Sequence, residues 1–422
     1  MRTLAALLGA ALMCPAADLP SPEKLPANPD LPDPLTTLAG KKVTTKKEWQ
    51  TVRRPELKEL FQHYMYGRYP AVPAKVSAKV LFEDKEAFGG KATVRELALT
   101  MSDQAPQVHV LLSLPNRRSG PAPVFVGLNF TGNHSITDHP KVRVPTEWMR
   151  NSPTVKANKA TEAGRGKSQR WPLEAIAERG YAVATAYYGE IIPDDPKVRG
   201  GLSEVLMPRV RNQHQTERPP EPDDTAAVMA WAWGLHRMID HLTTLPEIDA
   251  KRVAVVGHSR LGKAALVAAA FDDRLKVVMP HQAGCGGTGP SRSAANPKAE
   301  TVKRINTSFP HWFCGHFKAF NDDTTKLPFD QHCLVAICAP RPVLFTNATE
   351  DQWANPPGQF DVLKAATPVY KLLGDEGLEA EAYPEENKLI ASRLGYWVRP
   401  GKHDMTPDDW KTYLAFADRW LK

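Results

Sequence analysis

The sequence predicts an α/β protein in which a mostly parallel central sheet is flanked by helices in a three-layer sandwich, with long loop insertions. Strand patterns alternate with helix patterns along the chain, which is typical of βαβ units. The segment PVFVGLNF at 123–130 is almost continuously apolar, as expected of a central strand buried on both faces. The length of 422 residues suits one large α/β domain with insertions.

The individual elements follow from the same patterns. Apolar residues at helical spacing predict a first helix over 46–67. A second helix is predicted over 223–242, starting with Asp caps and with apolar residues three and four apart, which places Trp231 and Trp233 in the core. Further helices are predicted at 261–271 and 406–422. Strands are predicted at 76–82, 93–101, 108–115, 123–130, 181–188, 252–259, 275–284 and 341–351.

Two long irregular stretches interrupt this alternation. Residues 131–172 are rich in Asn, Lys and Arg, and residues 190–222 are rich in Pro and charge. Each stretch begins at the carboxyl end of a predicted strand, and ligands bind at this edge of the sheet in proteins of this kind. They therefore either form the walls of a pocket or are surface insertions.

The N-terminal segment predicts export. One arginine, a short apolar run and small residues around Ala16 are typical of a secretory signal peptide over 1–17. A Pro-rich, extended lead-in is expected over 18–45, followed by a single α/β domain over 46–422. The sequence therefore predicts a secreted or periplasmic protein. No other stretch is long and apolar enough to form a membrane helix. The protein is expected to be a monomer.

The net charge limits the kinds of binding partner that are expected. The charge of +7 favours an acidic partner or substrate. No basic run contains interleaved aromatic residues, so binding of nucleic acid is not expected.

Loss of the signal peptide leaves four cysteines, which are either core residues or disulfide partners. A metal site is not expected, because the His and Cys residues that lie close together in the sequence match no standard spacing of metal ligands. The cysteines are Cys285, Cys314, Cys333 and Cys338.

The segment RVAVVGHSRLGKAAL at 252–266 resembles a strand, a sharp turn and a helix, with Ser259 at the turn. The usual nucleophile elbow has glycine two residues after the serine, whereas here Leu261 holds that place and Gly262 follows it. A small residue therefore remains in the first helical turn, and close packing of helix on strand is still possible. Ser259 is accordingly predicted to be a nucleophile, the alternative being a helix N-cap.

Chain order indicates the partners of this serine, because in such enzymes the order is Ser, acid, His. His403 is the only histidine after the strand at 341–351, and it lies just before the final helix. Asp351 is the predicted acid, with Glu350 as the fallback. The other position for an acid, after the strand that follows the elbow, holds Gln282, which cannot offset the charge of an imidazolium.

Two cations adjoin the serine. Arg260 could stabilise an oxyanion through its side chain and its backbone N–H, and Lys263 lies one helical turn further on. Together they suggest an anionic or strongly polar substrate. The alternative is that both merely cover the helix surface.

Seven segments are distinctive when taken together: VFVGLNFTGNH at 124–134, GHSRLGK at 257–263, GCGGTGPSR at 284–292, ETVKRINTSFPHWFC at 300–314, LPFDQH at 327–332, APRPVLFTNATEDQWANP at 339–356 and GKHD at 401–404. They resemble segments of the glucuronoyl esterases, which are carbohydrate esterases with an α/β-hydrolase fold and a G-x-S-R-x-G-K signature around the serine. The resemblance is strong over about 250–410, and the segment at 124–134 extends it.

The resemblance implies hydrolysis of esters of 4-O-methyl-D-glucuronic acid, such as those that join glucuronoxylan to lignin, without metal or organic cofactor. It implies a catalytic set of Ser259, His403, Asp351 and Arg260, and substrate binding by Lys263, Glu300 and Trp353. The chain departs from many members at Gln282, where they carry the acid. Two alternatives remain open: an acetyl xylan esterase or other carbohydrate deacetylase, and a non-catalytic carbohydrate-binding protein.

Overall fold

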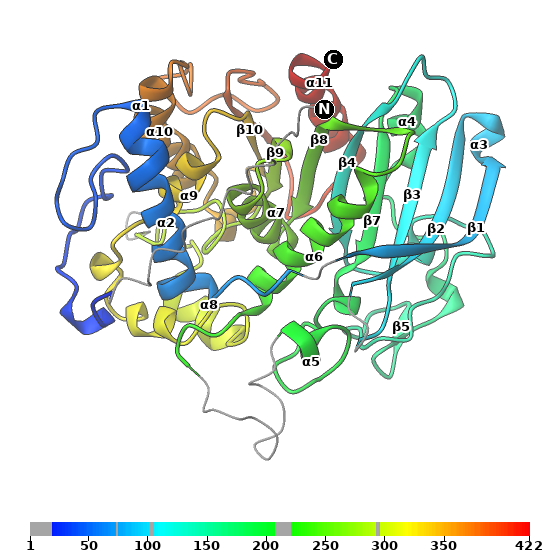
Figure 1. The fold of residues 1–422 in the computed structure, drawn as a ribbon, viewed down its shortest axis with the longest axis horizontal. Helices are drawn as coiled ribbons and strands as arrows, with labels where there is room; N and C mark the ends of the chain where they lie inside the picture. The colour runs from blue at the N-terminus through cyan, green and yellow to red at the C-terminus, as the bar shows by residue number, and fades with distance from the viewer. Residues whose placement is uncertain (1–18, 73–74, 102–104, 207–220, 293–295) are drawn as a thin grey trace, which may run out of the picture.

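A computed structural model describes residues 19–72, 75–101, 105–206, 221–292 and 296–422. Its main sheet has nine strands in the order β1-β2-β3-β7-β4-β8-β9-β10-β11, which Figure 1 shows running from β1 at the right to β10 left of centre. From β7 to β11 neighbouring strands are parallel, and β1, β2, β3 and β7 pair antiparallel. The strands are β1 Ser77–Glu86, β2 Ala92–Thr100, β3 Val108–Pro115, β4 Ala122–Asn129, β7 Ala182–Tyr187, β8 Ile248–His258, β9 Leu275–His281, β10 Val343–Ala348 and β11 Leu394–Arg399.

Helices cover both faces of the sheet, and the two faces have separate hydrophobic cores. Side chains alternate along β4, so that Val124 and Val126 belong to one core and Phe125 to the other. The first core includes α2 Arg54–Phe61, α6 Ala227–Leu242, α7 Arg260–Phe271, α9 Gln331–Cys338 and α10 Pro356–Leu373. The second includes α4 Leu173–Glu178 and α11 Pro407–Leu421. This arrangement confirms the predicted three-layer α/β sandwich.

The predicted helix over 46–67 is continuous but not uniform. It begins with α1 Lys46–Glu48 and contains two π-helical segments, Trp49–Arg53 and Gln62–Tyr66, on either side of α2. Trp231 and Trp233 on α6 are buried, as predicted, and their indole N–H groups donate to Ile192 O and Ala71 O.

The remaining described elements are short. The irregular stretch at 131–172 contains a two-stranded ribbon, β5 Val155–Lys156 and β6 Lys159–Ala160. The other short α-helices among the described residues are α3 Ala87–Gly90, α5 Ser203–Leu206 and α8 Val302–Ser308, and short 3₁₀ helices occur in several of the loops.

The described part of the lead-in, from residue 19, is mostly irregular and contains the 3₁₀ helix η1 Pro22–Lys24. Leu25, Leu35 and Val43 are buried, and the carbonyl of Pro32 lies 2.6 Å from His332 Nε2. The predicted signal peptide at 1–17 lies outside the described residues. Among the residues that are described, no helix is long and apolar enough to cross a membrane.

The sequence left open whether Cys285, Cys314, Cys333 and Cys338 form disulfides. In the structure all four are free thiols and all are buried. They are therefore core residues in this structure. Within the described ranges, no group of three or more His, Cys, Asp or Glu side chains is placed to hold a metal ion.

Candidate active site

The turn between β8 and α7 has the geometry of a nucleophile elbow. Ser259 adopts φ 58° and ψ −127°, a positive φ that non-glycine residues rarely take. A Cβ atom on Gly257 would lie 2.2 Å from Leu261 O, and one on Gly262 would lie 2.8 Å from Gly257 O and 3.0 Å from His281 O. Both glycines are therefore required for the close approach of helix and strand, including the glycine that is displaced by one position in the sequence.

His403 and Asp351 meet beside this turn. Asp351 follows β10 and is buried, and its Oδ2 lies 2.6 Å from His403 Nδ1. His403 comes from the loop between β11 and α11, and its side chain is 40% exposed. Glu350, the fallback acid, is exposed, and its backbone N–H donates to Gly401 O. The carboxylate in contact with the imidazole is thus that of Asp351.

The imidazole of His258 packs against the ring of His403. The ring centroid of His258 lies 4.5 Å from that of His403, and His258 is buried at the end of β8. Burial, helped by the neighbouring His281, His403, Arg170 and Arg260, lowers the pKa of His258 well below its usual value. His258 is therefore a neutral packing partner for the more exposed ring.

Gln282 occupies the position after β9 where an acid was the alternative. It is buried with φ 47°, and its Oε1 accepts a hydrogen bond of 3.0 Å from the N–H of Asp404. Its Nε2 is buried, and the described residues offer it no acceptor. Gln282 thus contacts the backbone next to His403, and its amide supports the loop that carries the imidazole.

Arg260 is the residue after the serine, and its side chain is 19% exposed. Its guanidinium carbon lies 4.9 Å from the ring centroid of Trp312, 5.5 Å from that of Phe309 and 5.7 Å from that of Phe130. Its Nη1 donates to Asp194 Oδ2. The guanidinium is therefore fixed by three rings and a carboxylate, instead of covering the helix surface.

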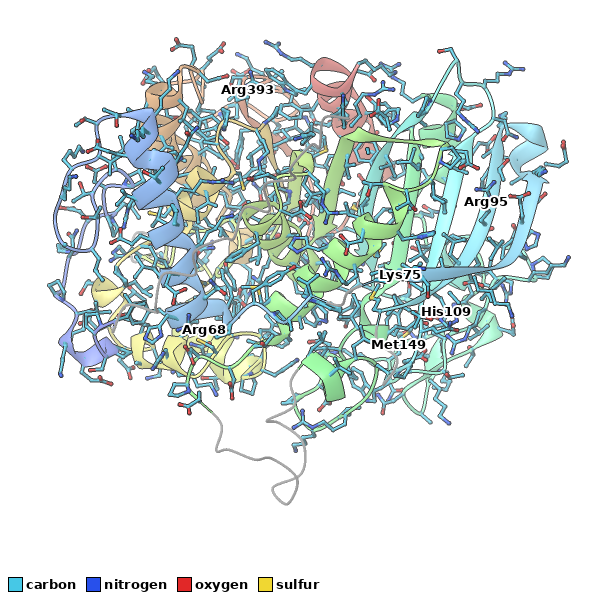
Figure 2. All side chains as sticks on the ribbon, viewed as in Figure 1. Arg68, Lys75, Arg95, His109, Met149 and Arg393 are labelled. Atoms are coloured by element: carbon cyan, nitrogen blue, oxygen red, sulfur yellow. The ribbon has the colours of Figure 1, made fainter. Side chains whose placement is uncertain are left out.

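Two cavities meet at Ser259, Arg260 and His403. One, of 290 Å³, is lined by the stretch 149–152 and by Phe130, Arg170 and Tyr188. Met149, the first residue of that stretch, is labelled in Figure 2. The other, of 370 Å³, lies on the β9 and β10 side. Part of the irregular stretch at 131–172 is thus a pocket wall, as one of the two interpretations expected.

The second cavity contains the remaining predicted substrate-binding residues. Lys263 and Glu300 are buried with Nζ and Oε2 3.7 Å apart, and Lys263 also donates to the carbonyls of Ala283 and Cys285. Burial lowers the pKa of Lys263 and raises that of Glu300. Trp353 is 39% exposed, and the guanidinium of Arg304 stacks 4.6 Å from its ring. This cavity therefore offers polar groups and an aromatic face together.

The arrangement contains site residues that the sequence did not indicate. Asp194, His311 and Trp312 form a hydrogen-bonded group against Arg260. Asp194 lies in the Pro-rich stretch at 190–222, where no motif or periodicity distinguished it. Trp312 lies in one of the segments that carried the family resemblance, which was the only signal for it.

Comparison with known proteins agrees with this geometry. Residues 220–374 match the family model described as glucuronyl esterase, fungi. The chain is 42% identical over 399 residues to carbohydrate esterase MZ0003 from an unknown prokaryotic organism, covering 93% of this chain and 89% of that one. It superposes on the glucuronoyl esterase from Solibacter usitatus with a TM-score of 0.84 and 39% identity, covering 95% and 100% of the two chains.

The chain belongs to the glucuronoyl esterase family. A third member, named 4-O-methyl-glucuronoyl methylesterase and found in Neurospora crassa, is 29% identical over 82% of this chain and 73% of its own length. Family membership confirms both the α/β-hydrolase fold and the serine-esterase class inferred from the sequence. The role of each site residue in this glucuronoyl esterase stays a prediction.

Proposed function

We propose that this glucuronoyl esterase hydrolyses esters of 4-O-methyl-D-glucuronic acid, including those that join glucuronoxylan to lignin alcohols, outside the cell or in the periplasm. The observation that carries the proposal is the meeting of two cavities at Ser259, where His403 is paired with the buried Asp351. An ester needs this layout, because its carbonyl carbon has an acyl group on one side and an alkoxy group on the other.

The uronic acid occupies the cavity that holds Lys263, Glu300 and Trp353. The ammonium and carboxylate groups suit sugar hydroxyls, and the exposed indole suits a sugar face. The alcohol then lies in the other cavity, which has apolar surface from Phe130, Tyr188 and neighbouring residues. His403 lines both cavities, so it is placed to protonate the departing alcohol.

The reaction follows from these positions. His403 removes the proton of Ser259, which attacks the ester carbonyl, and Asp351 stabilises the imidazolium that forms. Arg260 and the first N–H groups of α7 donate to the oxyanion. His403 gives its proton to the alcohol, and then activates the water molecule that releases the uronic acid and frees Ser259.

Turnover of benzyl D-glucuronate and 4-nitrophenyl acetate by the wild-type enzyme and the Ser259→Ala variant tests the proposal. We expect a strong preference for the glucuronate ester, and loss of turnover with retained binding of the sugar in Ser259→Ala. Strong preference for the acetate would favour a deacetylase. Binding of glucuronoxylan without turnover of either ester, and no effect of Ser259→Ala, would favour a non-catalytic binding protein.

A further inference from the structure

Asp194 is a buried carboxylate that no step of the proposed reaction uses. Its side chain is 0% exposed, and both carboxylate oxygens accept hydrogen bonds. Oδ1 accepts from His311 Nε2 at 3.0 Å and from Trp312 Nε1 at 2.7 Å, and Oδ2 accepts from the Tyr188 hydroxyl at 3.1 Å and from Arg260 Nη1. These donors come from three separate parts of the chain, so Asp194 joins three walls of the site.

The charge of Asp194 is retained despite its burial. Burial alone would raise the pKa of this carboxyl, but hydrogen bonds from His311 and Trp312 and the positive charge of Arg260 outweigh it and lower the pKa. A buried anion that accepts four hydrogen bonds is a rigid anchor, because moving any donor leaves part of the charge unsatisfied.

The guanidinium that Asp194 anchors has donors left over. Arg260 Nε is buried, and no described residue accepts a hydrogen bond from it. Nε is closed off from the cavities, so it cannot itself meet a ligand. The Arg260 side chain is 19% exposed and lines both cavities beside Ser259, so its exposed edge is the part that can donate to the carbonyl oxygen of a bound ester.

We propose that Asp194 is a positioning residue, which holds the Arg260 guanidinium in the orientation that stabilises the oxyanion formed during attack by Ser259. Asp194 touches neither substrate nor reacting atoms. The proposal rests on the role of Arg260 in the proposed function, and it names the residue that makes this role geometrically possible. Without the carboxylate, the guanidinium would lose its fixed direction while the aromatic rings would still hold it near the serine.

A double-mutant cycle tests the proposal, with Asp194→Asn, Arg260→Gln and the combination of both. Asparagine keeps the shape of the side chain but removes the charge. We expect Arg260→Gln to lower kcat by about 10²- to 10³-fold, as for loss of one oxyanion donor, and Asp194→Asn to lower it about 10- to 100-fold, both with KM within threefold of wild type. The double variant should be no slower than Arg260→Gln alone. Additive losses, or a change confined to KM, would overturn the proposal.

Asp330 provides a matched control. It is also a fully buried carboxylate paired with an arginine, Arg292 at 3.1 Å, but it lines neither cavity. Asp330→Asn should lower the melting temperature and leave kcat within threefold of wild type. If it lowers kcat as much as Asp194→Asn does, the effect is general loss of structure and the proposal fails.

A milder variant covers poor folding of Asp194→Asn. Tyr188→Phe removes one hydrogen bond to the oxygen that holds Arg260 and keeps the ring. It should lower kcat about three- to tenfold in the wild-type background and have no effect in Arg260→Gln, and an equal effect in both backgrounds would refute the proposal. All variants are assayed on benzyl D-glucuronate and on 4-nitrophenyl acetate. Because an oxyanion forms on either ester, the coupling is testable on the acetate even if the enzyme fails to use the glucuronate.

Discussion

Replacing Asp351 by asparagine separates the charge of this side chain from its shape. The oxygen that lies 2.6 Å from His403 Nδ1 stabilises the imidazolium that forms when Ser259 loses its proton. Two unit charges with centres about 4 Å apart attract by about 4 kcal/mol at an effective dielectric constant of 20. The ring is 40% exposed, so screening by water reduces this value, and we expect kcat to fall by about 10²- to 10³-fold.

Two further variants give this experiment its contrast. Gln282→Ala removes one neutral hydrogen bond, worth about 1 kcal/mol, and should lower kcat by about fivefold. Glu350→Gln alters an exposed carboxylate and should leave kcat near the wild-type value. The assay is release of benzyl alcohol from benzyl D-glucuronate at saturating substrate. A loss of less than fivefold in Asp351→Asn, or a larger loss in Gln282→Ala, would show that Asp351 does not hold the base.

The other predictions concern Gly262 in the elbow, the buried His236 on α6, and Glu300 in the cavity proposed for the uronic acid. Gly262→Ala places a methyl group 2.8 Å from a carbonyl oxygen and should destabilise the fold by about 1–3 kcal/mol in urea unfolding, whereas Gly120→Ala, with open space around it, should not. Burial lowers the pKa of His236 to about 4, below its usual value of 6.5, so the unfolded chain binds the proton more tightly. The contribution of His236 to stability is therefore complete above pH 6.5 and is lost as the pH falls toward 4, amounting to about 2 kcal/mol between pH 7.5 and pH 5. His236→Gln should flatten that part of the stability profile. Glu300→Gln should lower kcat/KM on the glucuronate ester by roughly 10- to 100-fold, mainly through KM, because it removes a charged partner of Lys263 and of a sugar hydroxyl, and it should spare the aryl acetate, which has no hydroxyl.

The sequence predicted the parts of the molecule that local chemistry determines. Buried parallel strands have a distinctive apolar pattern, and chain order with loop position indicated Ser259, His403 and Asp351, which the structure brings together at one junction. The displaced Gly262 was predicted to allow close packing, and the steric distances explain why a glycine is needed there.

Other features depend on contacts between distant segments. Helix α10 starts with two prolines and contains Pro368, so its composition resembles a loop although proline is favourable in a first helical turn. Strand β11 was missed as well, and it completes the sheet only by pairing with β10. Asp194 acquires its importance from Tyr188, Arg260 and Trp312, which are up to 118 residues away in the chain. No local pattern reports such a partnership.

The pairing of Arg260 and Lys263 with carboxylates has a consequence for product release. Arg260 is paired with Asp194 and Lys263 with Glu300, so the two positive residues that suggested an anionic ligand are each accompanied by a negative one. The uncleaved ester carries no charge on its acyl group, but hydrolysis turns that group into an anion at the same place. A lone guanidinium would retain this anion as an inhibitor. A guanidinium that is paired with a carboxylate still donates hydrogen bonds but attracts a distant anion only weakly. The enzyme can therefore stabilise the transient oxyanion and still release the uronate product.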